Sequence, residues 1–136
     1  MKGINPYLNF DGNTAEAMKF YAACLDAELH MQSFKDVGMD APGAEDRTVH
    51  AMLQKDGAVI MASDSQPGQP VSMGDNIWLN IDCSDAGEQD RYFKALGAGG
   101  NVVMPLAEQF WGARFGMLRD KYGVGWMFNC EMKQKG

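Results

Sequence analysis

The chain has 136 residues, 46% of them hydrophobic and 22% charged, which is the composition of a folded domain and excludes a disordered segment. Its net charge of −6, with no basic cluster, argues against nucleic acid and anionic membranes as partners. No apolar run is long enough to span a bilayer, and three widely spaced cysteines predict a reduced, cytoplasmic protein.

The first half of the sequence predicts one helix among four strands. The turn residues Asp11-Gly12-Asn13 separate a strand from a helix, and Asn13 and Glu16 have the spacing of a capping box. Asp56-Gly57 is a strong hairpin turn between two later strands. The expected elements are a strand at Ile4–Phe10, a helix at about Thr14–Asp26, and strands at Glu28–Asp36, Arg47–Lys55 and Ala58–Ser63.

The stretch 64–75, with two prolines and two glycines, is the predicted linker between two similar halves. With a shift of 71, eight of the 23 residues at 5–27 are identical to those at 76–98. We therefore expect a single domain over 1–136, built from two β-α-β-β-β modules at 1–63 and 76–136. The second module should contain a strand at Ile77–Asp82, a helix at about Asp85–Leu96 with Gly97 at its end, and strands at Asn101–Met104, about Arg114–Asp120 and Val124–Glu131.

Several short motifs carry a resemblance that covers nearly the whole chain. They include Pro6–Asn13 (PYLNFDGN), Met61–Asp64 (MASD), Phe110-Trp111 and Asp120–Met127 (DKYGVGWM). With them the chain resembles the PhnB-like branch of the vicinal oxygen chelate superfamily, which includes glyoxalase I, extradiol dioxygenases, and fosfomycin- and bleomycin-resistance proteins. The resemblance implies an α+β, glyoxalase-like fold, in which the two modules form a curved eight-stranded mixed sheet around a cavity. It also implies a homodimer.

Enzymes of this superfamily hold a divalent metal through His or Glu residues on the first and last strands of each module. The resemblance maps those positions onto Asn5, Met61, Asn76 and Met127. Asn is a weak neutral donor and the Met thioether suits soft ions, so this quartet does not make a site for Zn²⁺, Ni²⁺ or Fe²⁺. We expect no metal at these positions and no cofactor.

His50 is the candidate catalytic residue. It lies within a predicted strand, and related extradiol enzymes place an iron-binding histidine on the matching strand of their second module. A single histidine cannot chelate a metal, but it can act as a general base or hold a substrate oxygen. The alternatives are a hydrogen-bonded histidine that shapes the cavity and a core residue.

The aromatic stretch at 107–116, broken by two glycines, predicts part of a pocket wall, since small-molecule pockets combine apolar faces with a few polar groups. Each residue also has a simpler interpretation: the aromatic residues as core at a strand edge, Arg114 as a surface salt-bridge partner, and Asp64 as a turn residue. The predicted pocket residues are Asp64, Trp78, Phe110, Trp111, Arg114 and Phe115.

The leading functional hypothesis is a small-molecule-binding protein or a metal-independent enzyme with an aromatic cavity. One alternative is a metal-dependent lyase, isomerase or dioxygenase that recruits ligands from His50, Asp64 or Glu108. Another is a protein that sequesters a toxic compound, as bleomycin-resistance proteins do. The glycines at 97–100 follow a helix rather than a strand, so they do not predict a dinucleotide loop or a methyltransferase.

Overall fold

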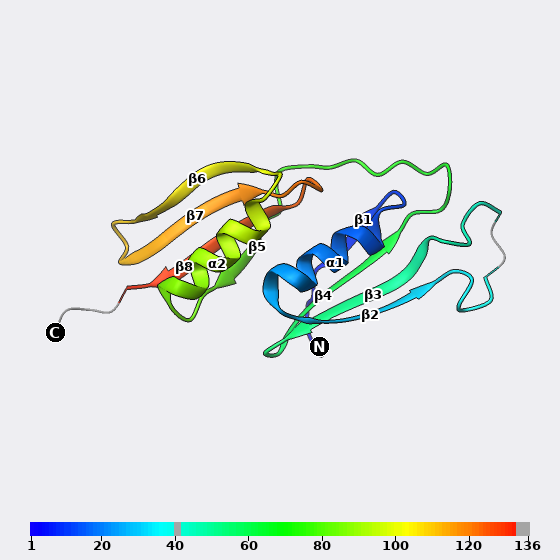
Figure 1. Cartoon of the computed structure of the whole chain (residues 1–136), viewed down its shortest axis with the longest axis horizontal. Helices are drawn as coiled ribbons and strands as arrows, with labels where there is room; N and C mark the ends of the chain where they lie inside the picture. Colours follow the sequence, from blue (N-terminus) through cyan, green and yellow to red (C-terminus); the bar gives the residue numbers. More distant parts are fainter. Residues whose placement is uncertain (40–41, 133–136) are drawn as a thin grey trace. The chain divides into compact units, whose positions relative to one another are not determined.

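The computed structural model describes residues 1–39 and 42–132, which contain two helices and eight strands (Figure 1). The chain divides into two compact units, unit 1 at Met1–Ser72 and unit 2 at Met73–Gly136. The boundary falls within the predicted linker. Neither described helix is long and apolar enough to cross a membrane.

Unit 1 is a four-stranded mixed sheet with one helix. The strands lie in the order β1-β4-β3-β2; β1 and β4 are parallel, and the other neighbours are antiparallel. Helix α1 packs against one face of this sheet, where alternate strand residues such as Phe10, Leu53 and Ala62 are buried (Figure 1). The elements are β1 (Tyr7–Phe10), α1 (Thr14–Leu25), β2 (Glu28–Ser33), β3 (Thr48–Lys55) and β4 (Ala58–Asp64).

Unit 2 has the same order of elements and of strands, β5-β8-β7-β6, with β5 and β8 parallel. Helix α2 packs against β7 and β8, and its side of the sheet buries Leu118, Trp126 and Phe128. Strand β6 is at the edge of the sheet. The elements are β5 (Leu79–Asp82), α2 (Ala86–Gly97), β6 (Asn101–Glu108), β7 (Ala113–Arg119) and β8 (Gly125–Glu131).

The predicted α+β class and the two β-α-β-β-β patterns are confirmed, with the eight strands divided between two four-stranded sheets. Most boundaries agree within three residues. Strand β6 is longer than predicted, because Pro105 is tolerated on an edge strand. The predicted stop at Gly97 is off by one residue, since Gly97 is the last residue of α2 and the extended Ala98 caps it.

The predicted capping box at Asn13 is wrong. Asn13 precedes α1, but its side chain makes no cap hydrogen bond. The carboxylate of Asp64, at the end of β4, takes that role from 50 residues away. Its Oδ1 accepts the backbone N–H groups of Gly12 and Thr14, each at 3.0 Å, and the Thr14 hydroxyl at 2.6 Å. Its Oδ2 accepts the backbone N–H of Thr48, at the start of β3, at 2.8 Å.

Asp64→Ala leaves these buried donors without an acceptor, so we expect it to lower the free energy of unfolding by about 3 kcal/mol or more. The midpoint of urea unfolding, followed by circular dichroism, measures this loss. Asp82→Ala is the matched control, because Asp82 is exposed at the end of β5 and its carboxylate accepts a hydrogen bond from the exposed Asn80 amide. A loss at Asp64 no larger than that of the control contradicts this role.

Candidate functional site

Each sheet has a second face, opposite its helix, which we call the helix-free face. Side chains alternate across a strand, so residues whose sequence neighbours are buried under the helix lie on this face. In unit 1, Ala51 and Leu53 are buried beneath α1, which places His50 and Met52 on the helix-free face. In unit 2 the same rule places Phe115 opposite α2.

His50 is half-buried and lies beside Tyr7 of β1. The Tyr7 hydroxyl is 3.4 Å from His50 Nδ1, and the ring centroids are 6.1 Å apart. The two strands are not neighbours, so the Tyr7 side chain crosses β4 to reach the imidazole. A phenol and an imidazole in contact can share a proton or hold a ligand oxygen together. Tyr7 was not among the residues predicted from the sequence. Alternation could have indicated it, because Leu8 and Phe10 point toward α1 and Tyr7 lies on the opposite face.

Asp64 does not lie on this face. It alternates with Ser63 and is 7% exposed, and both its carboxylate oxygens are used within unit 1. It is therefore a structural residue, and we do not retain it in the proposed binding set.

Three aromatic rings of unit 2 form a cluster at the β6–β7 turn. Phe110 and Trp111 meet edge to face at a centroid distance of 5.1 Å, and Trp111 and Phe115 do so at 5.7 Å. Phe115 is 9% exposed, whereas Trp111 is 51% and Phe110 98% exposed. The turn is held by Gln109, whose N–H donates to the Ala113 carbonyl. The cluster therefore has a buried base and an accessible rim.

Arg114 lies on the other face of the same strand. Its guanidinium forms an ion pair with Asp90 of α2 at 2.8 Å and a hydrogen bond to Gln89 at 3.3 Å. Gln89 is buried and donates in turn to the backbone carbonyls of Arg114 and Phe128. Arg114 thus joins α2 to the sheet, and it does not lie beside Phe115 as the pocket prediction requires.

Trp78 lies at the opposite end of the sheet of unit 2. Its ring covers Gly125, where an added Cβ would come within 2.6 Å of it, and the Arg119 guanidinium is 4.9 Å from the ring centroid. Arg119 is four residues from Phe115 along β7, which is about 13 Å. Trp78 is therefore separate from the aromatic cluster, contrary to the prediction that these rings form one wall.

The four positions that the resemblance maps to metal ligands are arranged differently in the two units. Met61 of β4 lies beside Tyr7, two residues from Asn5, whereas Met127 of β8 lies beside Asn80, four residues from Asn76. Both methionines are half-buried on helix-free faces, and both asparagines are exposed. Within residues 1–39 and 42–132, no three or more His, Cys, Asp or Glu side chains are grouped as a metal site would require.

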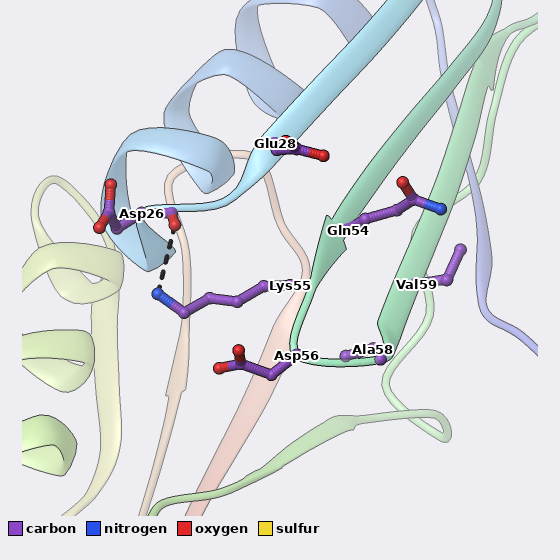
Figure 2. Close-up of a pocket in the computed structure, with 8 residues that line it drawn as sticks. Asp26, Glu28, Gln54, Lys55, Asp56, Ala58 and Val59 are labelled. Carbon is purple, nitrogen blue, oxygen red and sulfur yellow. Dashed lines mark hydrogen bonds between the residues drawn. The ribbon is translucent and has the colours of Figure 1, made fainter.

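A groove of about 440 Å³ lies elsewhere in unit 1, between the end of α1 and the β3–β4 turn (Figure 2). Lys55 crosses it and donates to the Asp26 carbonyl at 3.2 Å. Its other side chains are mostly charged or polar, and no residue of the predicted pocket contributes. The lining residues are Asp26, Glu28, Gln54, Lys55, Asp56, Gly57, Ala58 and Val59.

The paired β-α-β-β-β units define a protein of glyoxalase-like fold. The fold matches that of a glyoxylase/bleomycin resistance protein/dioxygenase domain from Frankia sp. EAN1pec, with a TM-score of 0.69 over 100% of this chain and 95% of that one. Sequence identity is 14%, so this likeness concerns the fold alone.

The chain belongs to the family described as 3-demethylubiquinone-9 3-methyltransferase, whose model matches residues 2–128. It is 38% identical to protein PA1353 from Pseudomonas aeruginosa (TM-score 0.89; 98% of this chain and 100% of that one). It is 30% identical to a putative 3-demethylubiquinone-9 3-methyltransferase, PhnB protein, from Bacillus cereus (TM-score 0.80; 95% and 99%). Protein YjdN of Escherichia coli K12 is 32% identical, with 96% of this chain and 97% of YjdN covered. The PhnB-like resemblance is thereby confirmed.

Cys83 of unit 2 is placed where a thiol is unreactive. Burial, assisted by the nearby carboxylate of Glu88, raises the pKa of the Cys83 thiol to about 12. At pH 8 only about one thiol in ten thousand is then ionised, and the thiolate is the reactive form. We expect iodoacetamide to modify the half-buried Cys24 first and to reach Cys83 only after urea unfolding, as measured by peptide mass spectrometry. Equal labelling rates in the folded protein contradict the assignment.

Proposed function

We propose that this protein binds a small organic molecule on the helix-free face of unit 2, without a metal at the glyoxalase positions. The observation that carries the proposal is the aromatic cluster of Phe110, Trp111 and Phe115. A soluble chain normally buries such rings, yet half of the Trp111 surface and nearly all of Phe110 remain accessible. Large aromatic faces with an accessible rim suit a flat, mostly apolar ligand.

His50 and Tyr7 form a separate, polar candidate site within unit 1. Both groups can donate or accept, so they suit a ligand oxygen such as a carbonyl or hydroxyl. If the ligand is also transformed, we propose that His50 acts as the general base. Tyr7 would then hold the His50 imidazole in position. The sequestering function of bleomycin-resistance proteins needs only the binding part of this arrangement.

Methyl transfer is not the activity that we propose, although the family description names it. The glycine-rich stretch at 97–100 lies between α2 and β6, so it is not the glycine-rich turn from a strand into a helix that holds a nucleotide cofactor.

A homodimer in the cytoplasm remains part of the proposal. Three consecutive apolar side chains of the edge strand β6, Val102, Val103 and Met104, are 48%, 51% and 39% exposed, and such a patch suits contact with a second copy. Light scattering on the purified chain measures its oligomeric state.

Ligand binding at the aromatic cluster is tested by following the three indole N–H signals in ¹⁵N NMR spectra. We expect aromatic carbonyl fragments, added as defined probes, to move the Trp111 signal and to leave that of the buried Trp126, bonded to Asp120, unchanged. Trp111→Ala should weaken binding about tenfold, since it removes roughly 1.4 kcal/mol of aromatic contact. Fragments that bind without moving the Trp111 signal contradict the location.

If His50 binds a ligand oxygen, its removal should weaken the binding of oxygen-bearing fragments only. His50→Ala should weaken binding of oxygen-bearing fragments about tenfold and leave the corresponding hydrocarbons unaffected, because one hydrogen bond is lost. Tyr7→Phe, which keeps the ring and removes the hydroxyl, should reproduce part of this loss. Calorimetric titration measures both. Equal losses for the two fragment classes would indicate a packing role instead.

A further inference from the structure

Arg119, at the end of β7, lies on the helix-free face of unit 2. Its neighbour Leu118 is fully buried on the α2 side, where its side chain is 3.2 Å from the position of a Cβ added to Gly97. Because side chains alternate along a strand, Arg119 projects to the same face as Met117 and Phe115. Arg119 is four residues from Phe115, so its place on the face is about 13 Å from the aromatic cluster.

The guanidinium of Arg119 is held through one nitrogen and is open at the other two. Its Nη1 donates to the Gly123 carbonyl at 2.9 Å and to the Gly74 carbonyl at 3.3 Å, and the Trp78 ring centroid is 4.9 Å away. Its Nε and Nη2 donate to no residue that the structure describes, and neither atom is buried. These two nitrogens form the edge of the group that can donate two parallel hydrogen bonds to a carboxylate.

The positive charge of Arg119 is not neutralised by a neighbouring acid. Arg47 and Arg114 pair with Asp11 and Asp90 at 2.9 and 2.8 Å. In the described part of the chain, no carboxylate lies within 4.0 Å of Arg119. Charges that are partly removed from water are usually paired, so this half-buried cation suits an anionic group on a ligand.

Acidic residues lie at the opposite end of the same face. Asp82 of β5 pairs with Asn129 of β8, which in turn pairs with Phe115. Glu131 lies two residues beyond Asn129 on the same strand, and both acids are exposed. The face is therefore negative near the aromatic cluster and positive at Arg119, so an anionic ligand group is repelled from the first end and attracted to the second.

The surface between the two ends is apolar. Met117 and Met127 are directly opposed on β7 and β8, and both are half-buried. Beyond them the Trp78 ring covers Gly125, where a Cβ would come within 2.6 Å of it. Methionine side chains are flexible and adapt to the shape of a bound group, so this stretch suits the hydrocarbon body of a ligand.

We propose that Arg119 binds a carboxylate of the ligand, through its Nε and Nη2, while the ligand's aromatic part lies on the cluster of Phe110, Trp111 and Phe115. The assignment rests on the proposed function and narrows its ligand class to elongated aromatic carboxylic acids. The aromatic part and the carboxylate of such a ligand are about 13 Å apart, the distance along β7 from Phe115 to Arg119. The single open edge of Arg119 matches one carboxylate.

The test is a ¹⁵N NMR titration of the full chain with naphthylalkanoic acids of increasing chain length. Each acid is compared with its primary amide, which has the same shape and no charge. The indole N–H of Trp78 donates to the Asp75 carbonyl at 2.9 Å and reports on the surroundings of Arg119. We expect acids that span the face to move the Trp78 and Trp111 signals together and to bind at least about tenfold more tightly than their amides. The Trp126 signal should not move.

Arg119→Gln removes the charge and the paired donors. It should weaken acid binding by about ten- to a hundredfold, to the level of the amide, and leave amide binding unchanged. Arg119→Lys, which keeps the charge without the two-donor edge, should recover part of the loss. Arg91→Gln is the matched control, because Arg91 is exposed on α2, on the other side of the sheet. It should leave both affinities unchanged.

Acids and amides that bind equally well overturn the assignment of Arg119 but leave the proposed function intact if the Trp111 signal still moves. Acid binding that weakens as much in Arg91→Gln as in Arg119→Gln depends on net charge alone and also overturns it. A Trp111 signal that neither ligand class moves contradicts the proposed function itself, and with it the span of the ligand. If Arg119→Gln does not fold, the affinity ratio of acid to amide and the Trp78 signal of the unaltered chain give the same decision.

Discussion

The carboxylate of Asp64 is the interaction on which the fold of unit 1 depends. It comes from the end of β4 and binds the start of α1 and the start of β3 with its two oxygens. Four donors converge on one buried, charged acceptor, and charge-assisted hydrogen bonds of this kind are the strongest that a chain makes with itself. The helix is thereby fixed over one face of the sheet, which leaves Tyr7 and His50 on the other. Unit 2 reaches the same arrangement through a local cap at Asp85 and the buried amide of Gln89.

Sequence patterns predicted the elements because their turns are strongly marked and their apolar residues alternate. They could not predict which distant group completes a local motif. The start of α1 was located at Thr14, but the nearby Asn13 was given a role that Asp64 performs. Nothing in the spacing of residues 13 to 16 reveals an acceptor on another strand.

For the candidate site, too, the sequence indicated residues that are close along the chain but not which distant residues share a face. The contact between Trp111 and Phe115 follows from a short turn, so its residues were found together. Arg114 was included as a polar group beside the aromatic residues, but consecutive strand residues such as Arg114 and Phe115 point to opposite faces. Trp78 was included because it alternates along its strand with the residues expected to face the cavity. Alternation predicts the face of the sheet but not the position along the strand.

The edge strand β6 has a consequence for how copies of this chain can meet. It carries the exposed run Val102–Met104, followed by Pro105, and its pairing with β7 shifts register on both sides of Met104. A straight apolar edge strand would pair side by side with strands of other copies, and repeated pairing of this kind leads to fibres. Here the proline removes a donor and the irregular register bends the backbone away from a regular ladder. Contacts made through this edge are therefore limited to side-chain packing, which can stop at a closed assembly.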